Sequence, residues 1–283
     1  MSKIAIITDS TAYLPPDTIH THNITVIPLM VNFGQESYKE GVDIIAEQFY
    51  PRLKTAQALP TTSQPAVGEV VQAYERLLEN HDAVIGLFLS GGLSGTAASA
   101  ETAARIVGGD KITVIDSQFT SWGLSEMVLT ACKMVEAGKS KDEIVEHLLK
   151  MRDEIEAFFV VDSLEHLHRG GRIGGVSAAL GTLLQVKPIL TLHGAVGKLE
   201  LKEKIRTRKK ALARVIELLK DRRDPARELR MSVVYTDNPE DGKAFQEQLR
   251  GEFPDAHIDL SELGPVIGTH VGPGLLAVLF YNR

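Results

Sequence analysis

The sequence predicts an α/β fold of two domains, an N-terminal three-layer α/β/α domain with a parallel sheet and a C-terminal α/β domain with a mixed sheet. First, strand and helix patterns alternate through the first half of the 283 residues, which favours a parallel sheet with helices on both faces. Second, this alternation ends near residue 156, and a predicted hairpin follows instead of another crossover unit. The predicted domains are therefore residues 1–156 and 157–283.

A strand at residues 83–89 organises the N-terminal domain. Its continuous apolar run, Ala-Val-Ile-Gly-Leu-Phe-Leu, is typical of a strand buried on both faces. A hydroxyl-rich glycine loop at 90–96 follows directly, and we expect the functional site at this junction. Around it the sequence predicts strands at 4–8, 24–31 (broken by Pro28) and 112–115, and helices at 43–56, 66–80 and 96–107.

Other signals predict the elements further along the chain. Gly138 ends one helix, and Ser140 with Glu143 forms the capping box of the next. Segments 189–192 and 198–202 flank a glycine turn, which predicts a hairpin. Further strands are predicted at 158–161, 231–235, 256–260 and 275–281, and helices at 207–220 and 239–249.

Composition and charge argue against several classes of function. With 43% hydrophobic and 24% charged residues, the chain has the composition of an ordinary globular protein. A net charge of −6 provides no positive field for nucleic acid or an anionic membrane. Cys132 is the single cysteine, so neither an intramolecular disulfide nor a thiolate metal cluster can form. Without a predicted signal peptide or membrane span, we expect a cytoplasmic protein with no stable membrane insertion.

The glycine loop is the first candidate site. It places hydroxyls and free backbone N–H groups at a helix N-terminus, where partial positive charge favours a carboxylate or a phosphate. The alternative is a plain turn in which Ser94 caps the helix. The loop lacks the Gly-Lys-Ser/Thr of a phosphate-binding loop, and Thr96 replaces the second glycine of a hydrolase elbow.

A second hydroxyl-rich segment and one histidine could complete such a site. Thr61, Thr62 and Ser63 stand in a row ahead of a helix, in the kind of loop that commonly holds ligands. The alternative is that Ser63 is only the N-cap of that helix. His270 lies in a glycine-rich stretch before the last strand and could pair with an acidic head group, or it could be a solvated loop residue.

The remaining histidines and the basic residues give weaker signals. His166 and His168 face opposite sides of a helix, which argues against a shared metal site, and we expect no metal. Local basic patches are either solvated surface or a docking site for an acidic partner or for phosphates. They comprise Arg169, Arg172, Lys202, Lys204, Arg206, Arg208 and Lys209.

Several motifs taken together resemble the DegV family of bacterial proteins, in the same order and across essentially the whole chain. The two most specific pieces are the Thr-Thr-Ser-Gln-Pro run and the Gly-Gly-Arg-Ile run. The matching pieces are Thr8-Asp9-Ser10-Thr11, Thr61-Thr62-Ser63-Gln64-Pro65 with Gly68-Glu69, Leu93-Ser94-Gly95-Thr96, Asp116-Ser117, Leu164 through Gly170-Gly171-Arg172-Ile173, Lys187-Pro188, Arg206-Thr207, and Gly264-Pro265 with His270.

The resemblance implies a fatty-acid-binding protein that serves a fatty acid kinase. One long acyl chain, such as palmitate or stearate, would lie between the two domains and would be presented to the kinase for phosphorylation, with no catalysis by this chain and no cofactor. Carried over by motif, Thr62 and Ser94 become the carboxyl ligands with Thr61 and His270 beside them. The secondary contacts would be Ser63, Ser90 and Gly95, and the docking residues Arg169, Arg172 and Arg206.

Departures from the family pattern affect the glycine loop. Gly91 stands where the family usually has a second serine, which removes one hydroxyl, and Ala97-Ala98 replaces a bulkier pair. Two other hypotheses are kept beside the carrier. One is an enzyme, either a glycine-loop phosphotransferase or a serine hydrolase that uses Ser94 on a small acid or ester. The other is a regulatory module whose basic patches bind a partner.

Overall fold

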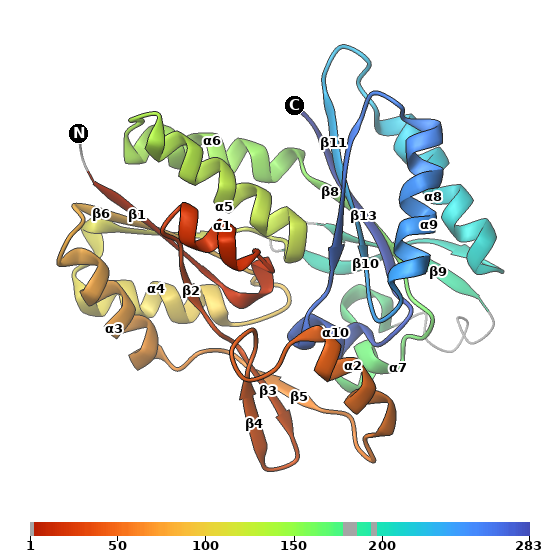
Figure 1. Ribbon diagram of the computed structural model, residues 1–283, viewed down its shortest axis with the longest axis horizontal. Coiled ribbons are helices and arrows are strands. Elements are labelled where there is room, and N and C mark those ends of the chain that lie inside the picture. Colours follow the sequence, from red (N-terminus) through yellow and green to blue (C-terminus); the bar gives the residue numbers. More distant parts are fainter. Residues whose placement is uncertain (1–2, 178–185, 194–196) are drawn as a thin grey trace.

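The computed structural model describes residues 3–177, 186–193 and 197–283. Within these ranges the chain forms two α/β units that lie side by side, with a small third sheet next to them (Figure 1). Both the parallel sheet and the mixed sheet of the prediction are present, so the predicted fold class is confirmed.

The N-terminal unit is built on a four-stranded parallel sheet in the order β2-β1-β6-β7. Its strands are β1 (Ile4–Asp9), β2 (Thr25–Ile27), β6 (Ala83–Phe88) and β7 (Ile112–Asp116). Alternate side chains of β6 enter two different cores, since Val84 and Phe88 pack with α3 and α4 while Ile85 and Leu87 pack with α5 and α6. The continuous apolar run of this strand follows from burial on both faces.

Helices therefore cover both faces of the parallel sheet, as the three-layer prediction requires. They are α1 (Pro16–Thr21), α3 (Val67–Leu78), α4 (Thr96–Val107), α5 (Ser121–Glu136) and α6 (Lys141–Glu154), with short 3₁₀ turns at Ser10–Ala12 and Gly109–Lys111. The predicted capping box is present, because Ser140 Oγ accepts the N–H of Glu143 and the Glu143 carboxylate accepts the N–H of Ser140.

A small antiparallel sheet, absent from the sequence prediction, lies beside the parallel one (Figure 1). Its order is β4-β3-β5, formed by β3 (Met30–Phe33), β4 (Glu36–Lys39) and β5 (Thr61–Ser63), and α2 (Ala46–Thr55) lies between β4 and β5 in the chain. The single strand predicted at 24–31 is split at Pro28, so that its first part joins the parallel sheet and its last part joins this one.

The C-terminal unit is a six-stranded mixed sheet in the order β10-β9-β8-β13-β11-β12, in which only the β11 and β12 pair is parallel. Its strands are β8 (Glu156–Val160), β9 (Lys187–His193), β10 (Lys198–Ile205), β11 (Leu229–Tyr235), β12 (His257–Glu262) and β13 (Leu276–Asn282). Its helices are α7 (Glu165–Arg169), α8 (Arg208–Arg222), α9 (Pro239–Glu252) and α10 (Pro265–Val271). The predicted hairpin is the β9 and β10 pair. The division of the chain at residues 156 and 157 stays a prediction.

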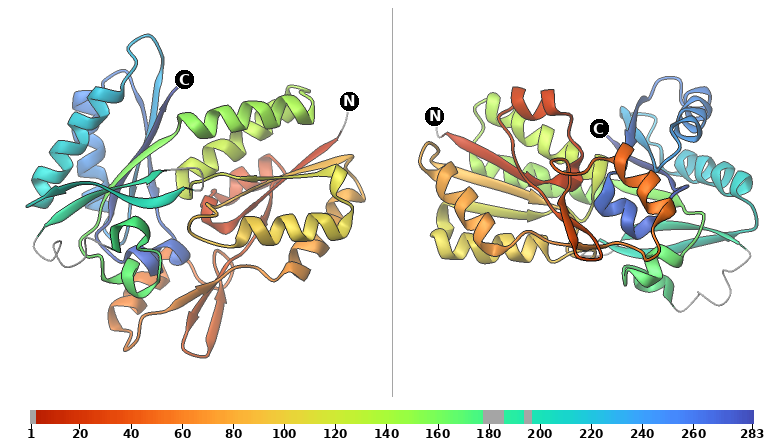
Figure 2. Two further views of the ribbon diagram at one scale, coloured as in Figure 1. Left: turned by 180° about the vertical axis from the view of Figure 1, so that it is seen from behind. Right: turned by 60° about the horizontal axis from the view of Figure 1, so that its bottom comes forward.

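The two faces of the mixed sheet have different neighbours. Helices α8 and α9 cover the face turned away from the parallel sheet, as two further views show (Figure 2). The other face shares one apolar core with α5, α6 and the parallel sheet. The space between the two units is therefore walled by both of them.

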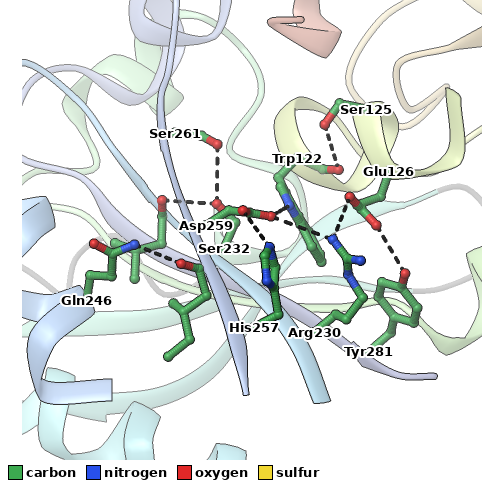
Figure 3. A network of polar contacts seen from close by, with 12 residues as sticks. Trp122, Ser125, Glu126, Arg230, Ser232, Gln246, His257, Asp259, Ser261 and Tyr281 are labelled. Carbon is green, nitrogen blue, oxygen red and sulfur yellow. Dashed lines mark hydrogen bonds and ion pairs between the residues drawn. The ribbon is translucent and has the colours of Figure 1, made fainter. Parts of the chain in front are cut away.

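A polar network also joins the two units (Figure 3). Trp122 on α5 donates its indole N–H to Asp259 on β12 at 2.9 Å, and Tyr281 on β13 donates to Glu126 on α5 at 3.1 Å. Arg230 on β11 lies 3.4 Å from Glu126 and 4.0 Å from Asp259, measured between side-chain nitrogen and oxygen atoms. Helix α5 is thus attached to three strands of the mixed sheet.

Candidate functional site

A mainly apolar cavity of about 280 Å³ lies between the two units. Its walls come from the inner face of the mixed sheet, from α10 and from the segments that follow strands β6 and β7 of the parallel sheet. Most of the lining is hydrocarbon, including Leu89, Phe159, Val234, Leu263, Leu275 and Leu279. A cavity of this kind suits a ligand with a long apolar portion.

Polar side chains gather on one part of this wall. Thr62 on β5 and His270 on α10 form a hydrogen bond of 2.7 Å between Oγ1 and Nε2, across 208 residues of chain. Ser94 of the glycine loop lines the same cavity, as do Gln64 and Arg172. The structure therefore brings together three of the four predicted head-group residues, although their role as carboxyl ligands stays a prediction. We call this part of the pocket the head-group end.

Thr61 and the secondary candidates occupy different positions. Thr61 is exposed and, in the described part of the chain, is not among the residues that line the cavity, whereas Ser63 is. Ser90 is buried, and its Oγ donates to the carbonyl of Gly197 at 2.9 Å and accepts the N–H of Gly92 at 3.1 Å. Ser90 therefore ties the glycine loop to the hairpin of the mixed sheet.

The capping interpretations of Ser63 and Ser94 are wrong. Ser63 belongs to β5, where it pairs with Met30, and the N-cap of α3 is Ala66. The N-cap of α4 is Gly95, and the Ser94 hydroxyl lies 2.9 Å from the hydroxyl of Thr96. Strand pairing holds Ser63 in β5, and Gly95 takes the N-cap position after Ser94, so each helix begins beyond its serine. Both serines remain in the cavity wall.

The glycines of the loop are explained by close contacts. A Cβ added at Gly95 would lie 2.4 Å from Oε1 of Gln64. One added at Gly91 would lie 2.6 Å from Oδ2 of Asp116, whose carboxylate already accepts the N–H of Gly91 at 3.1 Å. The side chain of a serine at position 91 would therefore point at Asp116. The hydroxyl that this chain lacks, relative to the usual family pattern, is thus one that would lie beside Asp116.

His270 is a buried helix residue, and the expectation of a solvated loop histidine is wrong. The sequence gives little sign of α10, because Gly268 lies in the middle of a helix of only seven residues and lowers its propensity, although Pro265 at the first position is a favourable start. Burial, followed by the charges of Arg172 and His166, lowers the pKa of His270 to about 4. The imidazole is therefore neutral near pH 7.

The tautomer of His270 follows from its surroundings. Among the described residues, Nδ1 has no hydrogen-bond partner, while Nε2 faces Thr62 Oγ1. We therefore assign the single proton of the neutral ring to Nε2, where Thr62 accepts it. The Thr62 hydroxyl keeps its own proton for another acceptor, such as a ligand oxygen.

The Gly-Gly-Arg-Ile motif packs directly behind this imidazole. A Cβ at Gly170 would lie 2.4 Å from Nδ1 of His270, so only glycine leaves room for the ring. Arg172 donates to the carbonyl of Leu93 at 3.1 Å and to that of Gly170 at 2.8 Å. The sequence analysis predicted that Arg172 is a docking residue and did not predict that Arg172 lines the cavity, as it does in the structure.

The other two predicted docking residues lie on the surface. Arg169 is well exposed and forms an ion pair with Glu165 at 2.8 Å. Arg206 is exposed directly after β10. In the described residues we find neither a group of three His, Cys, Asp or Glu side chains that could hold a metal ion nor a helix long and apolar enough to cross a membrane.

The fold and this cavity define a two-domain α/β protein with a mainly apolar cavity between its units and a group of polar side chains in the cavity wall. The sequence pattern of the DegV family, described as an uncharacterised protein family, matches residues 3–283. A DegV domain-containing protein of Halalkalibacterium halodurans is 40% identical over 282 residues, which are 99% of each chain. The chain belongs to the DegV family.

Solved structures agree with this assignment. A structure described as fatty acid binding of a DegV family protein from Thermus thermophilus superposes with a TM-score of 0.93 at 34% identity, covering 99% of this chain and all of the other. The structure of DegV, described as a fatty acid binding protein from Bacillus subtilis, has a TM-score of 0.92 at 38% identity and covers 100% of both chains.

Proposed function

We propose that this protein binds one long-chain fatty acid in the apolar cavity and presents its carboxyl group to a fatty acid kinase in the cytoplasm, without catalysing a reaction itself. The observation that supports this most directly is a mainly apolar cavity of about 280 Å³ whose wall includes the hydrogen-bonded pair of Thr62 and His270. The fatty acid binding described for the similar proteins of Thermus thermophilus and Bacillus subtilis supports the ligand class.

The apolar walls supply the affinity in this proposal. Burial releases about 0.8 kcal/mol per methylene, so a sixteen-carbon chain gains on the order of 10 kcal/mol before the cost of ordering the chain is subtracted. Contact between the acyl chain and the apolar walls therefore determines which class of ligand binds, and the contacts of the carboxyl group determine how that ligand is oriented in the cavity.

The head-group end supplies donors for a carboxylate. Thr62 has a free hydroxyl proton once its oxygen accepts from His270, Ser94 offers a second hydroxyl, and Arg172 brings a fixed positive charge. A buried carboxylate needs such partners, because an unpaired charge away from water is costly.

The geometry favours a carrier over the two enzymatic alternatives. A serine hydrolase needs a base on its nucleophile, whereas the hydroxyl of Ser94 bonds Thr96 and the nearby imidazole bonds Thr62. A phosphotransferase needs a phosphate-binding lysine, and the loop at 90–96 contains none. Presentation to a separate kinase needs a carboxyl group near the surface, and exposed Thr61, Ser63 and Gln64 flank the head-group end. Exposed Arg169 and Arg206 are the proposed docking residues.

The test is denaturing extraction of the purified protein followed by mass spectrometry. Recovery of about one long-chain fatty acid per chain supports the proposal, and the same protein should then support acyl phosphate formation by a fatty acid kinase. A protein that contains no lipid and takes up no added palmitate refutes the carrier. Release of product from a small ester by the protein alone supports the hydrolase instead.

A further inference from the structure

Two buried carboxylates lie outside the cavity wall but connect to both sides of the head-group end. Asp9 has no exposed surface and Glu40 is 3% exposed. Ser10 and Tyr13 lie beside them, and we call these four residues the carboxylate cluster. Burying a carboxyl group this deeply is costly unless it is hydrogen bonded, and both Asp9 and Glu40 accept hydrogen bonds from backbone N–H groups.

Asp9 holds the start of the glycine loop. It ends β1 and accepts three hydrogen bonds, from the N–H of Thr11 at 2.9 Å, the hydroxyl of Thr11 at 2.6 Å and the N–H of Leu89 at 2.7 Å. Leu89 follows β6, lines the cavity and is joined directly to the loop that carries Ser94. The carboxylate therefore fixes the point from which that loop departs.

Glu40 holds the first turn of the helix that carries His270. Its Oε1 accepts the N–H of Val266 at 2.7 Å, and its Oε2 accepts the hydroxyl of Ser10 at 2.6 Å. Val266 and His270 are four residues apart on α10 and both line the cavity, so they share one face of the helix. A carboxylate at a helix N-terminus is also favoured by the helix dipole.

Tyr13 and Gly264 complete this attachment. The Tyr13 oxygen accepts the N–H of Ile267 at 3.3 Å, and its hydroxyl is hydrogen bonded to Glu40. A Cβ at Gly264 would lie 2.5 Å from the Tyr13 ring and 2.9 Å from Oε1 of Glu40, so glycine is needed for the two units to approach here. Glu40 and Tyr13 of the N-terminal unit thus accept hydrogen bonds from two backbone N–H groups of α10 in the C-terminal unit.

We propose that Asp9 and Glu40 are positioning residues for the head-group end: Asp9 fixes the loop that carries Ser94, and Glu40 fixes the helix that carries His270 against Thr62. This inference rests on the proposed fatty acid binding. Ser10 couples the two carboxylates, because it follows Asp9 in the chain and donates to Glu40. One cluster therefore sets the distance between the two halves of the head-group end.

The experiment uses Glu40→Gln and Asp9→Asn in the full chain, with Glu126→Gln as the matched control. Glu126 is also buried, at 8% exposure, but it faces Arg230 and Tyr281 rather than α10 (Figure 3). Two quantities are measured for each variant: the affinity for palmitate, and the NMR signal of bound palmitate labelled at its carboxyl carbon. That signal reports the head group itself, and a purely structural loss of stability would leave it unchanged.

We expect Glu40→Gln and Asp9→Asn each to weaken palmitate binding by about tenfold and to shift or broaden the carboxyl signal, while Glu126→Gln changes neither. If Glu40 acts through His270, adding Glu40→Gln to a His270→Ala background weakens binding by less than about twofold. Should Glu40→Gln not fold, Tyr13→Phe removes part of the same attachment and is expected to shift the carboxyl signal in the same direction.

The inference is overturned if the Glu40 and Asp9 variants match Glu126→Gln in affinity and carboxyl signal, or if Glu40→Gln retains its full effect in the His270→Ala background. Failure of the proposed function looks different, because the wild-type protein would then bind no palmitate and give no bound carboxyl signal. In that case both proposals fall together.

Discussion

Replacing Gly170 by alanine tests the head-group geometry with one methyl group. The backbone of Gly170 is in the ordinary helical region, so alanine can adopt it without strain. The new Cβ would lie 2.4 Å from Nδ1 of His270 and 2.9 Å from the backbone oxygen of His166. The oxygen belongs to α7 and cannot move far, so the imidazole has to shift away.

The magnitude follows from these contacts. Overpacking of this kind costs about 1–3 kcal/mol of folding stability. A displaced imidazole also loses its 2.7 Å hydrogen bond to Thr62, which is worth about 1 kcal/mol. Since 1.4 kcal/mol is a factor of ten in affinity, the loss of about 1 kcal/mol at the head-group end should weaken palmitate binding about fivefold.

The neighbouring glycine provides the control. Gly171 has a φ of +71°, and nothing lies within 4 Å of a Cβ placed there. Gly171→Ala therefore costs about 1 kcal/mol of backbone strain without touching His270. Calorimetric titration with palmitate and urea unfolding are measured for both variants. Equal palmitate affinities for Gly170→Ala and wild type would refute the packing argument.

Three further predictions concern the carboxylate cluster, the hydroxyls and the surface. Burial raises the pKa of Glu40 from 4.5 to about 7, with the charge of Asp9 acting in the same direction. The native state then keeps a proton that the unfolded state releases, so the free energy of unfolding falls as pH rises from about 4.5 to about 7 and is level above. Urea unfolding across this range should show a drop of about 3 kcal/mol in wild type relative to Glu40→Gln, and parallel curves would contradict it. Thr62→Ala and Ser94→Ala should each weaken palmitate binding about tenfold or more in displacement assays, because each removes a donor to a charged group, and unchanged binding by both would place the carboxyl group elsewhere. Arg206→Glu should slow acyl phosphate formation by the kinase, most strongly at low salt, while the extracted lipid content stays at the wild-type level, and loss of that lipid would argue against a docking role.

The sequence predicted the regular elements well where one local signal determined them. The helix at 96–107 matches α4 at both ends, because alanine-rich spacing and the glycines on either side mark its bounds. The buried strand at 83–89 matches β6 to within one residue. Elements that depend on distant partners were missed: β5 is a strand because it pairs with β3, and its three residues are too few to show a strand pattern by themselves, although threonine favours strands.

Residues of the candidate site likewise divide into those that a local sequence signal indicated and those whose place depends on distant parts of the chain. Glycine and hydroxyl motifs indicated Thr62, Ser94 and His270, and the structure places all three on one cavity wall. Gln64 and Arg172 face the same cavity, but the direction of their side chains depends on packing between the two units. Glu40 gave no local signal, since nothing in a Lys-Glu-Gly sequence indicates a buried carboxylate at the end of a helix 225 residues away.

Trp122 makes the contact between the two units observable. It is the only tryptophan in the chain, and its indole lies 5.9 Å from the Tyr281 ring, next to pocket residues Thr120 and Ser121. Its N–H bond to Asp259 crosses from α5 to β12 (Figure 3). If the units separate to admit a ligand, the indole loses this bond and meets water, and its fluorescence shifts to longer wavelength. Tryptophan fluorescence would therefore report a separation of the two units without an added label.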